Sequence, residues 1–357
     1  MLAWPERWLL SLCLLVLVAL VAVDLAGGEQ STLSGAYGLA PVLASALLPA
    51  RPTILCAGAA VVTSAASFLW NDNLGSLDWS IRLLVAVALS VLAVVIASSR
   101  ERREQRLSRM TLIAETAQRA VLRAMPKSVG QVGFAARYVS AAEEARIGGD
   151  LYEVVATGFG TRAIVGDVRG KGLDAVQLAA TVLGAFRRAA FTTEDLAVVA
   201  RELDAVVSAV AEDEDFVTVV LVQFSEDGSL EVVNIAHLPP ILIDDGRPGS
   251  ARIMDTGTPV PPLGLHPDPT VTRTSWTTGT RLLLYTDGTT ESRDRNGRFF
   301  ELTAAAGALS RGTLDEALDE LIAQLTAHVG HRLTDDVALV LAERLSSAAV
   351  PAAGDGA

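Results

Sequence analysis

The sequence predicts two parts of different fold class: an all-α membrane part of about four transmembrane helices, followed by an α+β domain. Residues 1–98 are almost wholly apolar, whereas the rest of the 357-residue chain mixes apolar and charged residues. After Pro126 the apolar residues alternate or form short runs, which is typical of strands. Helical patterns fall between groups of strands rather than after every strand. This arrangement favours α+β layers over a doubly wound parallel sheet.

Charge is distributed unevenly along the chain. Residues 1–98 carry a net charge of −2, residues 99–127 a net +5 and residues 128–357 a net −15, which together give the chain's −12. A C-terminal domain this acidic lacks the basic patches that neutralise phosphates, so we expect no nucleic-acid partner. The two cysteines, Cys13 and Cys56, lie in apolar runs and predict neither a disulfide framework nor a thiolate metal site.

Four apolar stretches are candidate membrane spans. A spanning helix needs about 20 residues, in a range of roughly 17 to 25. The second stretch reaches this length only if Ser34, Gly35 and Ala36 are included. A cleaved signal peptide over residues 1–26 is disfavoured, because its apolar core would be long and the later spans would still anchor the chain. The spans are expected near residues 8–25, 34–50, 53–70 and 81–98.

Charges that flank these stretches predict their orientation. Arg7, Arg51 and the cluster Arg100–Arg109 fall on one side of the four spans, with Arg82 as an exception. Arginine-rich flanks face the cytoplasm. We therefore expect a multi-pass protein of the cell membrane, with both termini and the α+β domain in the cytoplasm. Transport is disfavoured, because Asp24 is the one acidic residue near an apolar core and lies near its end.

Residues 99–127 form the expected juxtamembrane linker helix. From 99 to 125 the segment contains neither Gly nor Pro, and it ends at Met125-Pro126. Its apolar residues alternate at spacings of three and four, like the seam of a coiled coil. Homodimerisation through this seam and packing on the chain's own domain both stay open, and the arginines nearest the membrane would attract anionic lipid headgroups. The seam comprises Leu107, Met110, Ala114, Ala117, Val121 and Ala124.

The α+β domain is expected over residues 128–345, with a disordered tail over 346–357. Helices are predicted at Leu173–Ala190, Leu196–Ala211 and Leu314–Val329. Strands are predicted at Gly133–Val139, Leu151–Ala156, Ala163–Val168, Phe216–Phe224, Leu230–Ile235, Pro240–Ile243, Arg281–Tyr285 and Val337–Leu341.

Four aspartates lie in short motifs at the ends of these strands. They are Asp150 in GGD, Asp167 in GDVRGKG, Asp287 in YTDG and Asp335 in TDDV. Taken singly, the Asp-Gly pair is also a hairpin signal, and the two acids of TDDV are also typical of a solvated loop. Their joint occurrence favours carboxylates around hard divalent cations such as Mg²⁺ or Mn²⁺. Paired ions of this kind activate water against phosphate esters.

The ordered set of motifs resembles that of metal-dependent protein serine/threonine phosphatases, in the bacterial SpoIIE-like branch related to phosphatase 2C. The resemblance covers about residues 110–345. It implies an α-β-β-α sandwich with two Mn²⁺ or Mg²⁺ ions at one end of two packed antiparallel sheets. The motifs are GGDLY, GDVRGKG, FVTVVLVQF, NIAHLPPIL, PLGL, LLLYTDGTTESRDRNGRF and TDDVALVL.

The resemblance also implies roles for single residues. Asp336 is expected to be a solvated neighbour rather than a ligand, and His237 to buttress a turn. Glu153 stands where the family often has Asp, and Ile235, Ala236 and Leu238 also depart from the pattern around His237. The implied catalytic and metal-binding residues are Asp150, Asp167, Asp287 and Asp335, with the backbone carbonyl of Val168 as a further metal ligand.

The function implied is a membrane-anchored phosphatase that hydrolyses phosphoserine or phosphothreonine with a metal-activated water. A phosphorylated anti-anti-sigma factor in a partner-switching pathway is the substrate that the resemblance suggests. A catalytically inactive scaffold that binds phosphoproteins is the alternative. A nucleotide cyclase is disfavoured, because Leu151-Tyr152 follows the GGD motif where that family has Glu-Phe.

Overall fold

The structure is a computed structural model, and it describes residues 4–27, 34–71, 74–140, 148–212, 214–244, 251–330, 333 and 335–346. The predicted tail lies outside these residues except for position 346. The chain divides into two compact units, Met1–Ser108 and Arg109–Ala357. The boundary falls inside the expected linker, so the second half of the linker belongs with the α+β domain.

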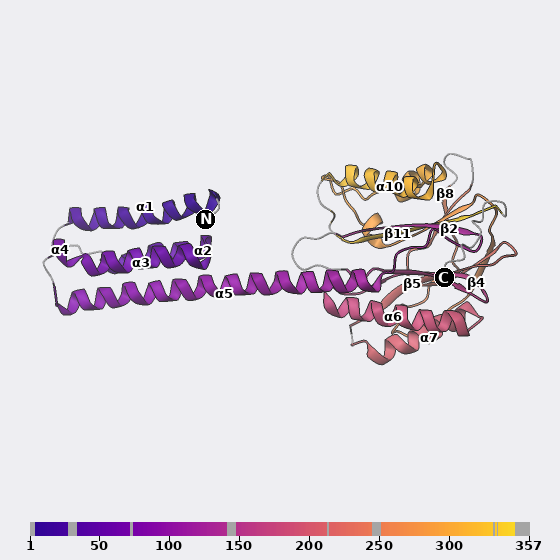
Figure 1. Ribbon diagram of the computed structural model, residues 1–357, viewed down its shortest axis with the longest axis horizontal. Coiled ribbons are helices and arrows are strands. Elements are labelled where there is room, and N and C mark those ends of the chain that lie inside the picture. Colours follow the sequence, from indigo (N-terminus) through magenta and orange to yellow (C-terminus); the bar gives the residue numbers. More distant parts are fainter. Residues whose placement is uncertain are drawn as a thin grey trace, which may run out of the picture. The chain divides into compact units, whose positions relative to one another are not determined.

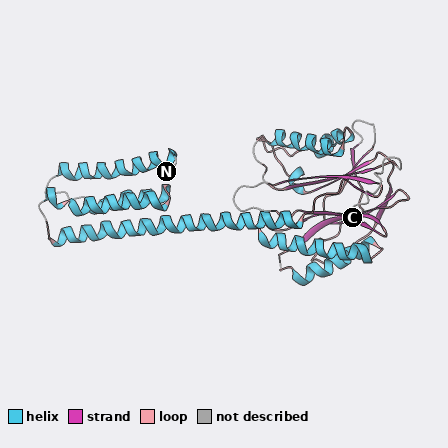
Figure 2. Cartoon of the chain, viewed as in Figure 1, coloured by secondary structure: helices cyan, strands magenta, loops and turns pink. Residues whose placement is uncertain are grey.

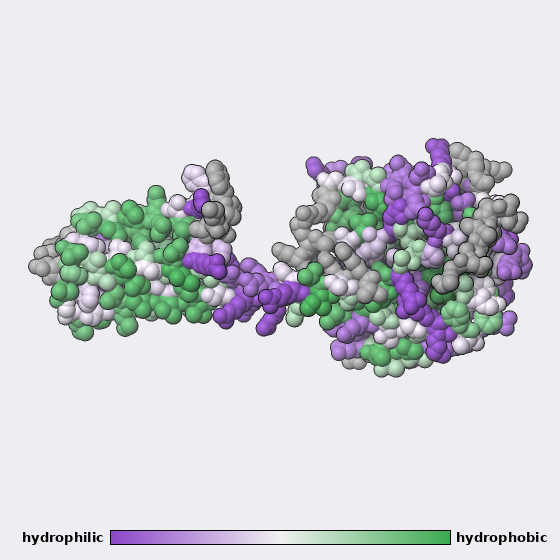
Figure 3. Space-filling view, viewed as in Figure 1, coloured by the Kyte–Doolittle hydropathy of each residue, from purple (hydrophilic) through white to green (hydrophobic). Residues whose placement is uncertain are grey.

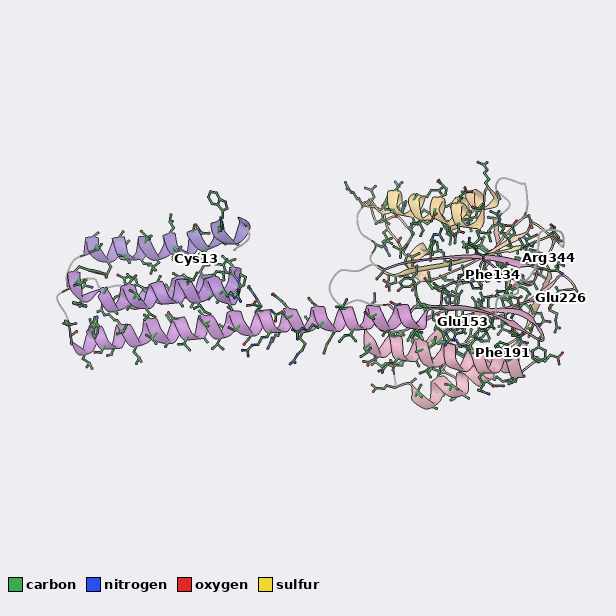
Figure 4. All side chains as sticks on the ribbon, in the orientation of Figure 1. Cys13, Phe134, Glu153, Phe191, Glu226 and Arg344 are labelled. Carbon is green, nitrogen blue, oxygen red and sulfur yellow. The ribbon has the colours of Figure 1, made fainter. Side chains whose placement is uncertain are left out.

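The first unit is a bundle of helices that lie side by side (Figure 1). Small side chains such as Ala40, Ala44 and Ala60 are fully buried between the helices, together with Cys13 (Figure 4). Small residues let helices approach closely, as is usual for helices packed in a bilayer. The elements are α1 (Trp4–Gly27), the 3₁₀ helix η2 (Ser34–Gly38), α2 (Leu39–Leu47), α3 (Ala50–Ala66), α4 (Phe68–Asn71) and the N-terminal part of α5 (Leu77–Val121).

Three helical segments are long and apolar enough to cross a membrane: Arg7–Ala26, Ala50–Asn71 and Leu77–Met110. The surface of the unit that they form is mainly hydrophobic (Figure 3). The second expected span corresponds to the shorter apolar helix Ser34–Leu47. At rises of about 2.0 Å per residue in η2 and 1.5 Å in α2, this segment is about 24 Å long. It is therefore shorter than the hydrocarbon core of a bilayer, which is about 30 Å thick.

Polar contacts nevertheless show that this short segment runs from one end of the bundle to the other. At one end the hydroxyl of Tyr37 donates a hydrogen bond to Asp24 (2.7 Å). At the other end the guanidinium of Arg100 donates to the carbonyl oxygens of Ala46 (2.5 Å) and Leu48 (2.9 Å). These bonds satisfy carbonyls that the end of α2 leaves without helical partners.

The second unit consists of two antiparallel sheets packed face to face, with helices on both outer sides (Figures 1 and 2). This confirms the predicted α-β-β-α sandwich. Sheet A has the order β1 (Ser128–Val129), β2 (Val132–Val139), β11 (Val337–Arg344), β10 (Arg281–Tyr285), β7 (Ile241–Ile243) and β8 (Ala251–Ile253), and is covered by α9 (Leu302–Ala305), η3 (Ala306–Ser310) and α10 (Leu314–Val329). Sheet B has the order β3 (Leu151–Thr157), β4 (Gly160–Val168), β5 (Val217–Phe224), β6 (Ser229–Ile235) and β9 (Thr272–Ser275), and is covered by α6 (Leu173–Thr192) and α7 (Leu196–Val210).

Alternation along the strands assigns each residue to a layer. In β4, Ala163 and Val165 face sheet A, whereas Ile164 packs against the helices on the other side. Between the sheets, the ring of Phe134 meets that of Phe224 edge to face at 5.8 Å. Because side chains alternate with a period of two, Asp167 lies on the same inter-sheet face as Ala163 and Val165. The inter-sheet layer therefore ends in a carboxylate.

Two buried arginines attach the covering helices to the sheets. Arg162 at the start of β4 is fully buried and donates to the carbonyls of Ala190 (2.9 Å) and Thr193 (2.5 Å) at the end of α6. Arg281 at the start of β10 donates in the same way to Leu309 (2.6 Å) at the end of η3. Both arginines lie at the opposite ends of their strands from the aspartates, so they fix the layers away from the candidate site.

The end of α5 packs on its own domain. Ala117 and Val121 of the predicted seam lie against Val176 of α6. Leu107 and Met110, earlier in the seam, are 55% and 58% exposed. The structure thus shows the packing alternative for the second half of the linker, and dimerisation through the first half stays a prediction.

Candidate active site and metal centre

The four predicted aspartates come from both sheets. Asp150 directly precedes β3, and Asp167 is the second-last residue of β4. Asp287 is the first residue of the short helix α8 (Asp287–Thr290), which follows β10, and Asp335 lies two residues before β11. The TDG motif therefore starts a helix here, and the hairpin alternative does not apply.

Electrostatic coupling shows that the four carboxylates are neighbours. Burial, followed by repulsion from Asp287 and Asp335, raises the pKa of Asp167 to about 7, while a hydrogen bond with Asp150 and the charge of Lys171 act in the opposite direction. Burial and then repulsion from Asp167 raise the pKa of Asp150 well above its usual value. The pKa of Asp287 is raised by burial and then by Asp335. Such mutual repulsion is characteristic of carboxylates held for a cation or for catalysis.

Thr286 connects the two sheets at this point. Its fully buried hydroxyl donates to Asp150 Oδ2 (2.7 Å) and accepts from the backbone N–H of Ala338 (2.9 Å). Its own N–H donates to the carbonyl of Ala338 (3.1 Å). One side chain thus holds Asp150 of sheet B against the adjoining ends of β10 and β11. The motifs in the sequence did not point to Thr286, although it directly precedes Asp287.

The two acids of TDDV have opposite environments, and the expectation that Asp336 is solvated is wrong. Asp336 is only 2% exposed and accepts hydrogen bonds from the N–H of Gly148 (2.8 Å) and the hydroxyl of Tyr138. The side chain of Asp335 is 44% exposed and accepts from Lys171 Nζ at 2.9 and 3.0 Å. Asp336 is buried because it continues the inward-facing positions of β11, and it fastens the GGD segment to sheet A.

Glycines allow these segments to approach one another closely. A Cβ on Gly149 would lie 2.5 Å from the carbonyl oxygen of Val168, and one on Gly148 would lie 2.6 Å from Asp336 Oδ2. A Cβ on Gly288 would lie 1.9 Å from the carbonyl oxygen of Asp336. Only glycine fits such contacts. The carbonyl of Val168, a predicted ligand, is therefore directly beside the GGD motif.

The chemistry of this donor set fits hard divalent cations, which prefer carboxylate and carbonyl oxygens. Among the described residues, no three His, Cys, Asp or Glu side chains are arranged as a formed metal site. Carboxylates can repel one another without forming a coordination site. Charge repulsion acts over several ångströms, whereas coordination requires oxygens at about 2.0–2.6 Å from the ion. The ligand roles of Asp150, Asp167, Val168, Asp287 and Asp335 therefore stay predictions.

His237 connects the sheets beside the aspartates. Its ring is buried; Nε2–H donates to the carbonyl of Tyr285 (3.1 Å), and the hydroxyl of Thr218 donates to Nδ1 (2.9 Å). Thr218 is the strand neighbour of Asp167. Burial lowers the pKa of His237 to about 4, so the ring is neutral at pH 7. These contacts support the structural role expected for it.

Glu153, which departs from the family pattern, takes part in an ion-pair network. Its carboxylate is 4% exposed, and both oxygens lie 2.7 Å from Arg187 Nε of α6. Figure 4 shows Glu153 near the end of α5. Arg123 lies 3.8 Å from the Glu153 carboxylate, and Arg187 also donates to the carbonyl of Val121 (3.4 Å), so the network reaches the end of α5. The longer Glu side chain thus joins β3, α6 and the linker.

The two-layered antiparallel sandwich with helices on both outer faces is the fold of PP2C-type phosphatases. The SiaA-PP2C domain of Pseudomonas aeruginosa matches 70% of this chain over 100% of its own length, with a TM-score of 0.57 and 19% identity. The RsbU and RsbW domains of Rv1364c from Mycobacterium tuberculosis match with a TM-score of 0.51 and 26% identity. This second match covers 60% of the present chain and 60% of the Mycobacterium tuberculosis chain. The C-terminal unit thus has the fold of PP2C-type phosphatase domains.

The family can be named as well. The family model for stage II sporulation protein E (SpoIIE) matches residues 157–345. The chain therefore belongs to the SpoIIE family, which confirms the resemblance seen in the motifs. No curated protein matches the chain.

Proposed function

We propose that this chain is a membrane-anchored, metal-dependent phosphatase that hydrolyses phosphoserine and phosphothreonine in proteins. The observation that supports this most is that both sheets of a SpoIIE-family domain contribute Asp150, Asp167, Asp287 and Asp335 to one site, where burial and then repulsion raise the pKa of the first three. Two Mn²⁺ or Mg²⁺ ions, when bound, supply an activated water for attack on a phosphate ester.

The residues of the chain prepare this site. The four aspartates and the carbonyl of Val168 would hold the cations. Because burial and then mutual repulsion raise the pKa of Asp150 and Asp167, cation binding releases protons and relieves the repulsion. The hydroxyl of Thr286 orients Asp150, and the neutral ring of His237 links β5 of sheet B to β10 of sheet A beside Asp167.

Phosphate release from a phosphoserine peptide tests the proposal. The full-length chain in detergent with Mn²⁺ should release phosphate, and Asp167→Asn should lower the rate by about a hundredfold or more, as expected for loss of a metal ligand. Asp268→Asn, an exposed position outside the cluster, is the matched control and should keep the wild-type rate. Peptide binding without phosphate release in any divalent metal would instead support the inactive scaffold.

We further propose a location and a substrate class. Arginine-rich flanks support a cell-membrane protein whose catalytic unit is cytoplasmic. The similarity to a structure containing RsbU and RsbW domains supports a phosphorylated anti-anti-sigma factor as substrate. Phosphoproteins that accumulate both in a deletion strain and in an Asp287→Ala strain would identify the target, and different sets in the two strains would contradict the assignment. The exposed Leu107 and Met110 support a homodimer through the linker.

A further inference from the structure

A recess of about 580 Å³ adjoins the aspartate cluster. Its lining includes Lys171 and Asp335, together with Arg293 and Arg295 from the segment after α8. Its volume is in the range of sites that hold small molecules or several side chains. Whatever binds at the aspartates therefore has room to place neighbouring groups in this recess.

Three acidic side chains, Glu291, Asp294 and Asp335, also line the recess, and local contacts engage two of them. Asp335 is paired with Lys171. Asp294 Oδ1 accepts the backbone N–H groups of Asn296 (2.7 Å) and Arg298 (2.9 Å), and these bonds hold the pKa of Asp294 below its usual value. Asp294 is thus engaged in its own turn.

The two arginines, in contrast, keep most of their donors available. The guanidinium of Arg293 lies 4.0 Å from the centroid of the Phe299 ring, which fixes its position without using an N–H group. Arg295 donates one hydrogen bond, to the carbonyl of Gly330 (3.2 Å). Neither has an ion-pair partner among the residues that the structure describes. A guanidinium carries five N–H donors in a planar fork that matches carboxylates and phosphates.

We infer that Arg293 and Arg295 bind acidic side chains that flank the phosphorylated residue of a protein substrate. The inference rests on the proposed phosphatase function. An acidic partner needs such a local basic site, because the net charge of the chain is −12 and repels it elsewhere. The continuity of the recess with Asp335 places this contact next to the phosphorylated residue.

Two phosphoserine peptides of equal length test the inference, one with Asp and Glu around the phosphoserine and one with Ala and Ser. The full-length protein should show a higher kcat/KM for the acidic peptide. Arg293→Gln with Arg295→Gln should reduce the acidic-to-neutral ratio of kcat/KM by about five- to twentyfold, since an exposed ion pair typically contributes up to about fivefold. The wild-type ratio should also fall with added salt, because exposed ion pairs are screened.

The matched control is Arg201→Gln with Arg252→Gln, which removes the same charge from exposed positions on α7 and β8. The ratio should be retained in this control. Equal kcat/KM for the two peptides in the unaltered protein, or an equal loss of the ratio in both double variants, would overturn the inference. Failure of the unaltered protein to release phosphate from either peptide would contradict the proposed function itself, and the inference with it.

Discussion

Burial raises the free energy needed to keep the individual aspartates of the cluster charged, and repulsion between them adds to it. A carboxyl whose pKa is raised in the folded protein destabilises the fold above its usual pKa. Asp150, only 4% exposed, is the strongest case. Asp150→Asn should therefore raise the thermal midpoint of the metal-free protein at pH 7.5 by about 2–4 °C per kcal/mol of relieved repulsion. The same change should remove the additional stabilisation by Mn²⁺ that the wild type shows.

Thermal unfolding with and without Mn²⁺ measures both effects. Asp268→Asn serves as the control, because it changes the same charge at an exposed position. A lower thermal midpoint for metal-free Asp150→Asn than for the wild type would contradict the prediction. It would mean that the hydrogen bond from Thr286 to the wild-type Asp150 stabilises the protein more than the repulsion destabilises it.

His237 should make stability depend on pH. Its pKa is about 4 in the folded protein and about 6.5 when unfolded, so between these values only the unfolded chain binds a proton. The stability present above pH 6.5 is therefore lost as the pH falls to 4, by about 3 kcal/mol in total. In His237→Gln this dependence should be absent, so the unfolding free energies of wild type and variant should converge by that amount from pH 7 to 4. Parallel pH profiles would contradict the assignment.

At the scale of elements, the turn between β10 and α8 lies against the start of β11. A Cβ on Gly288 would lie 1.9 Å from the carbonyl oxygen of Asp336, which is backbone and cannot move aside. We expect Gly288→Ala to destabilise the protein by about 3 kcal/mol or more. Gly184→Ala in α6 should instead stabilise it by about 0.5–1 kcal/mol, because a Cβ there meets no atom within 4 Å. Urea unfolding of both variants tests the contrast, and similar changes in both would refute it.

The longer strands could be predicted from the sequence because their apolar residues alternate or run continuously, as in β3, β5 and β11. The edge strands β8 and β9 were not predicted, because three or four residues are too few to carry a periodic signal. The aspartates of the site were found through their motifs. Thr286 and Asp336 were not, since their roles depend on hydrogen bonds to residues 136 and 188 positions away. Sequence spacing does not contain that information.

At the scale of the whole molecule, the proposed orientation in a membrane depends on whether Ser34–Leu47 completes a crossing. Its ends lie near Asp24 and Arg100, at opposite ends of the bundle. We therefore expect reporters fused at the N-terminus and after residue 98 to be active on the same, cytoplasmic side. Reporters on opposite sides of the membrane would show that only the three longer helices cross.

Lys171 gives the recess a chemical property of its own. The chain contains only two lysines, Lys127 and Lys171. Amine acylation can therefore modify only these two ammonium groups and the α-amine. Mass spectrometry after brief acylation of the wild-type protein would then measure occupancy of the recess, because a bound molecule would protect Lys171 from acylation. Lys127 would serve as an internal standard in the same molecule.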